Sequence, residues 1–343
     1  MLNFEMTLFK TIIVMSVLIT LNIFILTNDT FNVKRSADFI IREISSIQQK
    51  NNVNDNNTVK EFESIIVRPK YDIKCESILE MDSNEVEKSN RLLKYLKTIG
   101  KNYKVNMIND ENYIFNTSMC DSYKSIRGFE HVDKYNEQFE KEFPLAFAIL
   151  TYQHAEQIDR LLKLIWRPQN YYCIHIDSKS TDSFKKAIHS IANCFDNVFI
   201  TKKSENMVWA GFSILKAELN CMEDLDTSDK KWKYLIHMSG NEFPLKTNYE
   251  LVKILKMYNG ANEIEIVNGS SVTYRIQYKH KVNSQNKLEK TNLKLDKPPH
   301  NFTINKGYTN AVLSREFANF VLTDRRVQDL IDWAKDMTVP DEM

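Results

Sequence analysis

The chain has 343 residues and a formal net charge of +1, with 43% hydrophobic and 27% charged residues. These ordinary globular values argue against whole-chain disorder, and the balanced charge argues against a nucleic-acid partner. The seven glycines are too widely spaced to form either a dinucleotide-binding G-x-G-x-x-G or a P-loop.

The N-terminal region contains an uncharged apolar run over residues 11–27. It is just long enough to cross a bilayer, and no small-x-small cleavage site follows it. We therefore predict an uncleaved signal-anchor helix rather than a cleaved signal peptide. Residues 1–10 would form a cytoplasmic tail, and the polar, Asn-rich residues 28–66 a lumenal stem. Residues 67–343 would form the folded domain, beginning with a helix over 84–99.

Cysteines and sequons both fit a lumenal location for this domain. Five cysteines occur without any C-x-x-C pair, which disfavours a zinc site and permits disulfides. Of the five N-x-S/T sequons, the one at Asn28 lies too close to the predicted membrane span to be used. The candidate glycosylation sites are therefore Asn56, Asn116, Asn268 and Asn301.

From Phe143 onward, short apolar runs alternate with amphipathic segments. Strands are predicted over 147–150, 171–176, 197–201 and 233–238. Helices are predicted over 155–166, 181–192, 212–225 and 247–258, the last opening on a T-x-x-E capping box. This alternation predicts an α/β fold with a mostly parallel sheet and helices on both faces.

The pattern weakens after about residue 268. Residues 292–307 are expected to form a loop, followed by a strand over 308–314. Helices are then expected over 314–322 and 326–337.

Ligands of such sheets lie at the carboxyl ends of the strands, which here carry several polar residues. Asp177 could hydrogen-bond a ribose or base, or it could cap the following segment. Glu242 could face a ligand or be a polar turn residue. Asp224 and Asp226 match a metal-binding D-x-D but follow a helical run, so a solvated helix end is the better interpretation.

The histidines offer no defensible catalytic set. His175 and His237 lie within apolar strands and are expected to be buried and hydrogen-bonded.

Several long motifs, in the same order, resemble the core 2/I-branching β-1,6-N-acetylglucosaminyltransferases. They read QNYYCIHIDSKS, IANCFDNVFIT, AELNCMEDL, WKYLIHMSGNEFPLKTNYELV, AVLSREFANFVL and WAKDMTVPDE. The likeness covers about residues 70–343 and includes all five cysteines. It implies a GT-A-like α/β fold preceded by a transmembrane helix and stem, in a single-pass type II protein of the Golgi membrane.

The resemblance also implies a reaction. Members transfer GlcNAc from UDP-GlcNAc, with inversion, to the 6-hydroxyl of a Gal or GalNAc acceptor in glycoprotein O-glycans or I branches. They need neither a metal ion nor another cofactor. The implied donor-binding residues, called the predicted donor residues below, are Leu150, Thr151, Tyr152, Asp177, Ser178, Lys179 and Trp209. Tyr152 and Trp209 stand where the family commonly has His and Tyr.

An inverting transfer needs one carboxylate to take the proton of the acceptor hydroxyl. The family's P-D-E motif places this base at Glu342, and Glu265 and Arg275 match acceptor-binding residues. The family's lysine between those two is replaced, near Val272 or Thr273, by a residue that is not basic. By the same resemblance, disulfides are expected between Cys120 and Cys194 and between Cys173 and Cys221, with Cys75 free.

The end of the chain departs from the family pattern. It stops at Met343, whereas relatives continue with basic side chains that neutralise the leaving diphosphate and with the partner of Cys75. A fragment, or a truncated relative that binds nucleotide or glycan with impaired catalysis, is therefore expected. An enzyme like the peptide O-xylosyltransferases, which share the fold, is the other alternative.

Overall fold

A computed structural model describes residues 74, 77–78, 81–99, 107–130, 132, 137–227, 229–266 and 274–342. They belong to two compact units, one holding the described residues up to 99 and the other those from 107 onward. The predicted signal anchor and stem, Cys75, Asn56 and Asn268 lie outside the described residues. Among the helices that are described, none combines the length and the hydropathy needed to cross a bilayer.

The first unit contains one long helix, α5 (Ser83–Ile99), which confirms the helix predicted over 84–99. Asp82 fixes its start, because the Asp82 carboxylate accepts a hydrogen bond of 2.9 Å from the backbone N–H of Glu85. This is the arrangement of an N-cap, which satisfies a backbone donor that the first helical turn leaves unpaired.

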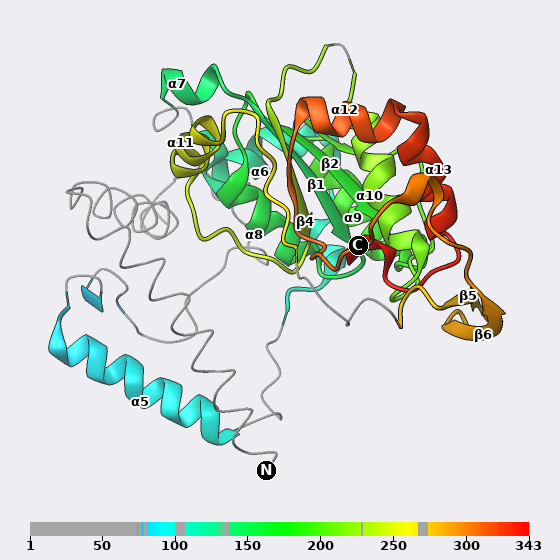
Figure 1. The fold of residues 1–343 in the computed structure, drawn as a ribbon. Helices are drawn as coiled ribbons and strands as arrows, with labels where there is room; N and C mark the ends of the chain where they lie inside the picture. Colours follow the sequence, from blue (N-terminus) through cyan, green and yellow to red (C-terminus); the bar gives the residue numbers. More distant parts are fainter. Residues whose placement is uncertain are drawn as a thin grey trace. The chain divides into compact units, whose positions relative to one another are not determined.

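The second unit is built on a five-stranded sheet (Figure 1). Its strands lie in the order β3, β2, β1, β4, β7, and their bounds are β1 (Leu145–Thr151), β2 (Tyr171–Ile176), β3 (Val198–Ile200), β4 (Tyr234–Ser239) and β7 (Val312–Ser314). The first four strands are mutually parallel and β7 is antiparallel to β4. The predicted mostly parallel sheet is therefore confirmed.

Helices cover both faces of this sheet. Successive side chains along β1 point to opposite faces, and each face packs against its own group of helices. Leu145, Phe147 and Ile149 belong to one apolar cluster with α8 (Ala155–Ile165), α9 (Asp182–Ala192) and α11 (Asn248–Tyr258). Ala146 and Ala148 belong to a second cluster with α10 (Phe212–Leu225) and α12 (Arg315–Thr323). Figure 1 shows α10, α12 and α13 (Arg325–Ala334) on the side of the sheet opposite α6 (Cys120–Arg127), α8 and α11.

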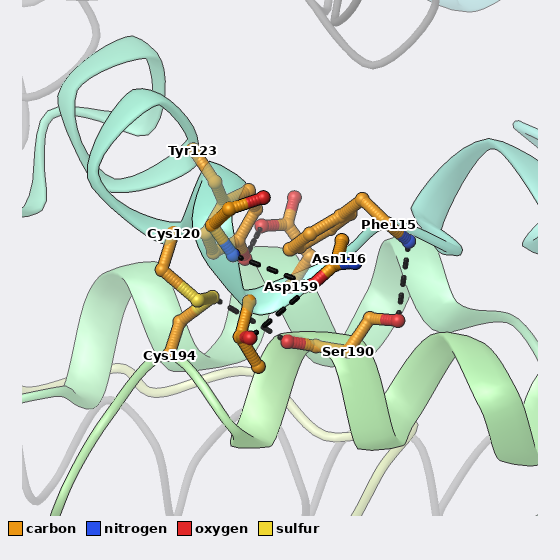
Figure 2. Close-up of a disulfide and its surroundings, with 9 residues drawn as sticks. Phe115, Asn116, Cys120, Tyr123, Asp159, Ser190 and Cys194 are labelled. Carbon is orange, nitrogen blue, oxygen red and sulfur yellow. Dashed lines mark hydrogen bonds between the residues drawn. A yellow bond between two sulfur atoms is a disulfide. The ribbon is translucent and has the colours of Figure 1, made fainter.

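The segment before the sheet packs on the α8–α9 side and was not predicted as structured. It contains η4 (Asp110–Tyr113), η5 (Thr117–Met119) and α6. The predicted Cys120–Cys194 disulfide is confirmed and joins the start of α6 to the residues just after α9, with a Cα separation of 5.0 Å (Figure 2). Nearby, the buried Asp159 accepts a hydrogen bond of 2.6 Å from Tyr123 and pairs with Arg127 at 2.6 Å.

The predicted Cys173–Cys221 disulfide is wrong for this structure, since both residues are free, buried thiols. Cys173 on β2 and Cys221 on α10 both lie in the second apolar cluster. Burial raises the pKa of the Cys221 thiol well above its ordinary value. Disulfide formation requires a thiolate and access to an oxidant, and this enclosed apolar setting opposes both.

A two-stranded hairpin, β5 (Tyr278–Val282) and β6 (Leu288–Lys294), overlaps the segment predicted as loop. Most of its side chains are exposed or half-buried, so the sequence lacks the alternation of apolar and polar residues that marks a half-buried strand. Its attachment is polar instead, because the Lys279 ammonium pairs with Asp336 at 2.8 Å and the His280 N–H donates to the Asp336 carbonyl.

Two of the candidate glycosylation sites lie within the described residues. Asn116 is exposed, and its side chain caps η5 by accepting from the Ser118 N–H. Asn301 is also exposed and ends the short η8 (Pro299–Asn301). Their use as glycosylation sites stays a prediction.

Candidate active site

A pocket of about 720 Å³ opens at the carboxyl ends of β1, β2 and β4. In the strand order, β2 and β3 lie on one side of β1 and β4 lies on the other, which is the topological switch point where α/β sheets bind ligands. Seven separate segments of the chain line it. Their lining residues are Leu150 and Tyr152; Asp177 and Lys179; Met207, Trp209, Ala210, Ile214 and Glu218; His237, Met238, Ser239 and Glu242; Tyr274 and Arg275; Thr309 and Asn310; and Val339, Asp341 and Glu342.

Asp177 shapes the turn that follows β2. Its carboxylate accepts a hydrogen bond of 2.9 Å from the Lys179 N–H, while the Lys179 ammonium lies 3.4 Å from the other carboxylate oxygen. The same ammonium donates to the Met207 carbonyl. Asp177 thus caps a local turn, as one interpretation predicted, and also lines the pocket; its hydrogen bond to a ribose or base stays a prediction. The turn places one cation beside one anion at this end of the pocket.

An exposed aromatic side chain stands at the pocket rim. Trp209 is 87% exposed, although an indole of this size usually packs against other groups. It precedes Ala210, which adopts a left-handed φ of 62°, and Gly211, whose N–H donates to the Val208 carbonyl in a tight turn before α10. The backbone therefore presents the indole outward, where it can stack on a ring of a ligand.

Glu342 also lines the pocket and lies in the one-turn helix η9 (Pro340–Glu342). Its carboxylate is 2.8 Å from the Arg275 guanidinium and 4.0 Å from the Lys306 ammonium. Its carbonyl accepts a hydrogen bond of 2.6 Å from the Gly307 N–H. The structure thus brings the predicted base and the predicted acceptor residue Arg275 together.

The segment before Glu342 is held against the Trp209 loop. The Val339 N–H donates to the Ala210 carbonyl at 2.7 Å, and Val339 has a φ of 53°. A left-handed conformation is strained for a β-branched residue and persists only where the surroundings fix it. The segment that carries Glu342 is therefore linked directly to the loop that carries Trp209 through this hydrogen bond.

Three further titratable residues line the pocket below Glu342. The Glu218 carboxylate on α10 lies 3.6 Å from His237 Nδ1 on β4, and both side chains are more than nine-tenths buried. Burial, reinforced by the negative charge of Glu218, raises the pKa of Asp341 to about 6. Perturbed acids in a cleft are typical of functional sites.

Sequence reasoning missed Glu218 and Asp341, although a signal for Glu218 existed. On α10, Glu218 lies one helical turn before Cys221 and Met222 and one turn after Ile214, so it occupies the apolar face that packs on the sheet. A glutamate at such a position is an informative exception. Asp341 had no separate signal beyond its place beside the predicted base.

Some predicted site residues do not line the pocket. Thr151 is buried and packs closely against Gly240, since a Cβ atom added to Gly240 would lie 2.7 Å from the Thr151 hydroxyl. Ser178 is exposed and its N–H donates to the Glu205 carbonyl. Glu265 is exposed, and its carbonyl approaches Gly307, the residue that binds the Glu342 carbonyl. Their ligand contacts stay predictions.

The D-x-D carboxylates lie away from the pocket, at the end of α10 as predicted. Asp224 accepts hydrogen bonds from the Thr201 hydroxyl and the Lys202 N–H, and Asp226 lies 3.6 Å from Arg315. Their side chains are only 12% and 15% exposed, so they are largely buried and paired instead of being solvated. Across the described residues, no group of three or more His, Cys, Asp or Glu side chains is placed to hold a metal ion.

Glu242 is a turn residue that also lines the pocket, and its contact with a ligand stays a prediction. It accepts from the Ser239 N–H as a turn residue and from the Asn310 amide across the pocket. His175 is buried as predicted and accepts a hydrogen bond from the Glu205 N–H, and burial lowers its pKa. His237 is buried as predicted, but its ring makes no hydrogen bond within the described residues, since Nδ1 lies 3.6 Å from Glu218 and Nε2 is enclosed without a partner.

The fold and pocket together define a mixed, mostly parallel α/β domain of the glycosyltransferase-like class. The chain belongs to the Core-2/I-Branching enzyme family, whose model matches residues 145–343.

Characterised relatives agree with this assignment. A human beta-1,3-galactosyl-O-glycosyl-glycoprotein beta-1,6-N-acetylglucosaminyltransferase is 37% identical over 285 residues, which are 83% of this chain and 65% of the relative. A human relative with the same name and the suffix 3 is 41% identical over 68% of this chain and 53% of its own length. A mouse N-acetyllactosaminide beta-1,6-N-acetylglucosaminyl-transferase is 42% identical over 60% of this chain and 52% of its own.

The chain thus spans between about half and just under two thirds of the length of these relatives. Among solved structures, a 4-diphosphocytidyl-2C-methyl-D-erythritol synthase from Anaerococcus prevotii aligns with a TM-score of 0.26 and 10% identity over 55% of this chain and 80% of its own.

Proposed function

We propose that this protein transfers GlcNAc from UDP-GlcNAc to the 6-hydroxyl of a Gal or GalNAc residue in a glycoprotein O-glycan or I branch, with inversion. Family membership and the relatives' activities support the reaction class. The observation that carries the proposal is the pocket itself. Five of the seven predicted donor residues line it, and so does the predicted base Glu342.

The reaction requires the base and the nucleotide to be held in one pocket. The acceptor 6-oxygen attacks the anomeric carbon of GlcNAc from the face opposite UDP, so base and nucleotide must lie on opposite sides of the sugar. The bond from the anomeric carbon to the phosphate oxygen breaks as the new glycosidic bond forms. Glu342 takes the proton of the acceptor hydroxyl, and the electron pair leaves with UDP.

Arg275 and Lys306 give Glu342 a fixed position in this reaction. Charge-assisted bonds to a guanidinium are directional, so the Arg275 contact of 2.8 Å holds one carboxylate oxygen and leaves the other for the acceptor. Lys179 lines the nucleotide end, where its ammonium would face the diphosphate. Cations placed where charge develops are usually the largest single contribution to catalysis.

The test is transfer by the full chain from radiolabelled UDP-GlcNAc to a Galβ1-3GalNAc acceptor, with the linkage read by NMR. Glu342→Gln should lower kcat at least about a hundredfold and leave the Kd for UDP within about threefold. The matched control is Glu316→Gln, an exposed carboxylate on α12 outside the pocket. Equal activity of the Glu342→Gln variant and the wild type would contradict the assignment of the base.

The same assay separates the alternatives. A UDP-xylose donor accepted in preference to UDP-GlcNAc would favour the enzyme resembling peptide O-xylosyltransferases. Tight binding of UDP without turnover of either donor would favour a nucleotide-binding relative with impaired catalysis.

We also propose that the reaction needs no metal ion. This rests on the D-x-D carboxylates, which are already engaged by Thr201, Lys202 and Arg315 away from the pocket. Transfer should therefore survive EDTA. Activity that is lost on chelation and restored by Mn²⁺ would contradict the proposal.

The cellular setting is proposed from the sequence alone. The apolar residues 11–27 favour a type II anchor in the Golgi membrane, with a GT-A-like domain in the lumen. Protease protection of the folded domain in sealed Golgi vesicles tests this orientation.

A further inference from the structure

Glu218 is a buried carboxylate that the reaction described above does not use. Its side chain is only 9% exposed, yet it lines the pocket. Within the described part of the chain, its closest charged partner is His237 Nδ1 at 3.6 Å, beyond hydrogen-bonding distance. Burying a carboxylate without hydrogen bonds is unfavourable, so such a group in a native pocket needs an explanation.

The groups around Glu218 do not relieve this cost. His237 Nε2 and Asp341 Oδ1 are both enclosed and without a hydrogen-bond partner. Asp341 adds a second carboxyl close enough to Glu218 for the two charges to repel. The Glu218 oxygens, by contrast, are not among the enclosed unpartnered atoms, so they keep contact with the pocket space. A ligand entering the pocket would meet this carboxylate before the two atoms behind it.

Its position in the fold indicates which part of a ligand it would meet. Trp209 and Ala210 immediately precede α10, and Ile214 and Glu218 follow along the same helix face, all of them lining the pocket. Asp341, which interacts with Glu218, is the neighbour of Glu342 in the chain. Glu218 therefore lies on the floor between the exposed indole and the base. In a transfer reaction, the transferred sugar occupies that interval.

We propose that Glu218 binds the transferred sugar of the nucleotide donor by accepting hydrogen bonds from two neighbouring pyranose hydroxyls. This assignment rests on the proposed function for the identity of the donor. A carboxylate accepts two hydrogen bonds through its two oxygens, and a pyranose presents adjacent hydroxyls at matching spacing. His237 Nδ1 lies 3.6 Å from the carboxylate and restricts its orientation.

The proposal predicts a selective loss of affinity. Hydrogen bonds from a ligand to a charged group are stronger than those to a neutral one, so Glu218→Gln should weaken UDP-GlcNAc binding about ten- to a hundredfold. Binding of UDP alone, which has no sugar beyond the diphosphate, should change less than about threefold. Both dissociation constants are measured by calorimetry on the full chain, with thermal unfolding of each variant recorded beside them.

The matched control is Glu223→Gln on the same helix. Glu223 is 41% exposed, pairs with Lys203 at 2.8 Å and does not line the active-site pocket. This control should leave both dissociation constants unchanged. Equal weakening of UDP and UDP-GlcNAc in the Glu218→Gln variant would show a purely structural effect and overturn the proposal. Unchanged affinity for UDP-GlcNAc, or no binding of it by the wild type, would also overturn it.

A ligand series keeps the test independent of whether the variant folds. The wild type should bind the 3-deoxy, 4-deoxy or 6-deoxy analogue of UDP-GlcNAc at least about tenfold more weakly when the missing hydroxyl is one that Glu218 accepts. Full affinity for all three analogues overturns the proposal. These binding measurements do not depend on turnover. A failure to transfer GlcNAc would contradict the proposed function, but the binding constants would still test the role of Glu218.

Discussion

At the scale of single residues, Asp341 links the chemistry of the pocket to the stability of the fold. Burial and the Glu218 charge raise the pKa of Asp341 from 3.8 to about 6. The folded chain therefore binds this proton more tightly than the unfolded chain does between those two pH values. The stabilising effect of the bound proton is complete below about pH 4 and is lost as the pH rises through 6.

Asp341→Asn should consequently stabilise the fold at neutral pH. An uncharged isostere avoids the cost of the buried charge, which is at most roughly 3 kcal/mol for a shift of about two pKa units. We expect a gain of about 1–3 kcal/mol at pH 7.5 that shrinks toward zero at pH 4, measured by urea unfolding at a series of pH values. A gain that does not vary with pH would contradict the role of ionisation.

The buried ion pair of Arg127 and Asp159 gives a second residue-scale prediction. Their side chains are 5% and 0% exposed and lie 2.6 Å apart, so Arg127→Met would leave an uncompensated charge in the core. We expect a loss of about 3–5 kcal/mol in the free energy of unfolding.

A surface pair provides the control. Arg326 is 60% exposed and lies 2.9 Å from Asp324, and Arg326→Met should cost less than about 1 kcal/mol. Similar losses in the two variants, measured by urea unfolding, would contradict the importance of burial.

The location of individual residues at the pocket could be predicted from the sequence where the strand ends alone decided the position. Asp177, Lys179 and Tyr152 follow strands of the central sheet, and the switch-point rule brings strand ends together. Glu218 was missed because it lies on a helix whose apolar face was assumed to be core. The contacts of Arg275 with Glu342 join segments more than sixty residues apart, and local patterns carry no information on such pairings.

At the scale of elements, the disulfide attaches α6 to the end of α9. The bond closes a loop of 74 residues, for which chain-entropy reasoning gives a stabilisation of roughly 4 kcal/mol. Replacing both Cys120 and Cys194 by Ala should lower the free energy of unfolding by about 2–4 kcal/mol, because measured effects commonly fall below that estimate.

Reducing agent extends this test to the second cysteine pair. Dithiothreitol should lower the stability of the wild type to that of the double variant and should not affect the double variant. A further loss in the double variant would reveal another reducible bond and would contradict free thiols at Cys173 and Cys221.

Prediction of elements succeeded where an apolar face meets the sheet. The bounds of α10 matched the predicted 212–225, and the Thr247–Glu250 capping box begins α11 as expected. Prediction failed for the β5–β6 hairpin, because charged side chains on both faces of a strand leave no periodic signal. The strand predicted over 308–314 begins only at Val312, where pairing with β4 starts.

At the scale of the second unit, the residues that stabilise the fold differ from those that line the pocket. Among the described residues, the apolar clusters on the two faces of the sheet contain none that follows α13 in the chain. The pocket instead assembles at the sheet edge from segments that reach from Leu150 to Glu342. Stability and chemistry therefore depend on different parts of the chain, with the final residues serving the pocket.

A chain ending after Met337 tests this separation. The shortened chain would lack Glu342 and the Val339–Ala210 and Gly307–Glu342 hydrogen bonds. Met337, which is 1% exposed, and both apolar clusters would stay in place. The strain at Val339 would be lost as well. We expect the free energy of unfolding to fall by no more than about 2 kcal/mol, since Pro340 is the one buried side chain among the described residues that are removed.

The same variant should keep the nucleotide end of the pocket. Asp177, Lys179 and Trp209 remain, so the Kd for UDP should stay within about threefold of the wild-type value. Transfer of GlcNAc should fall as far as in Glu342→Gln, because both changes remove the only proposed base and a general base contributes at least about a hundredfold. Unfolding at 25 °C, or loss of UDP binding, would show that the final residues also maintain the fold and would contradict the separation.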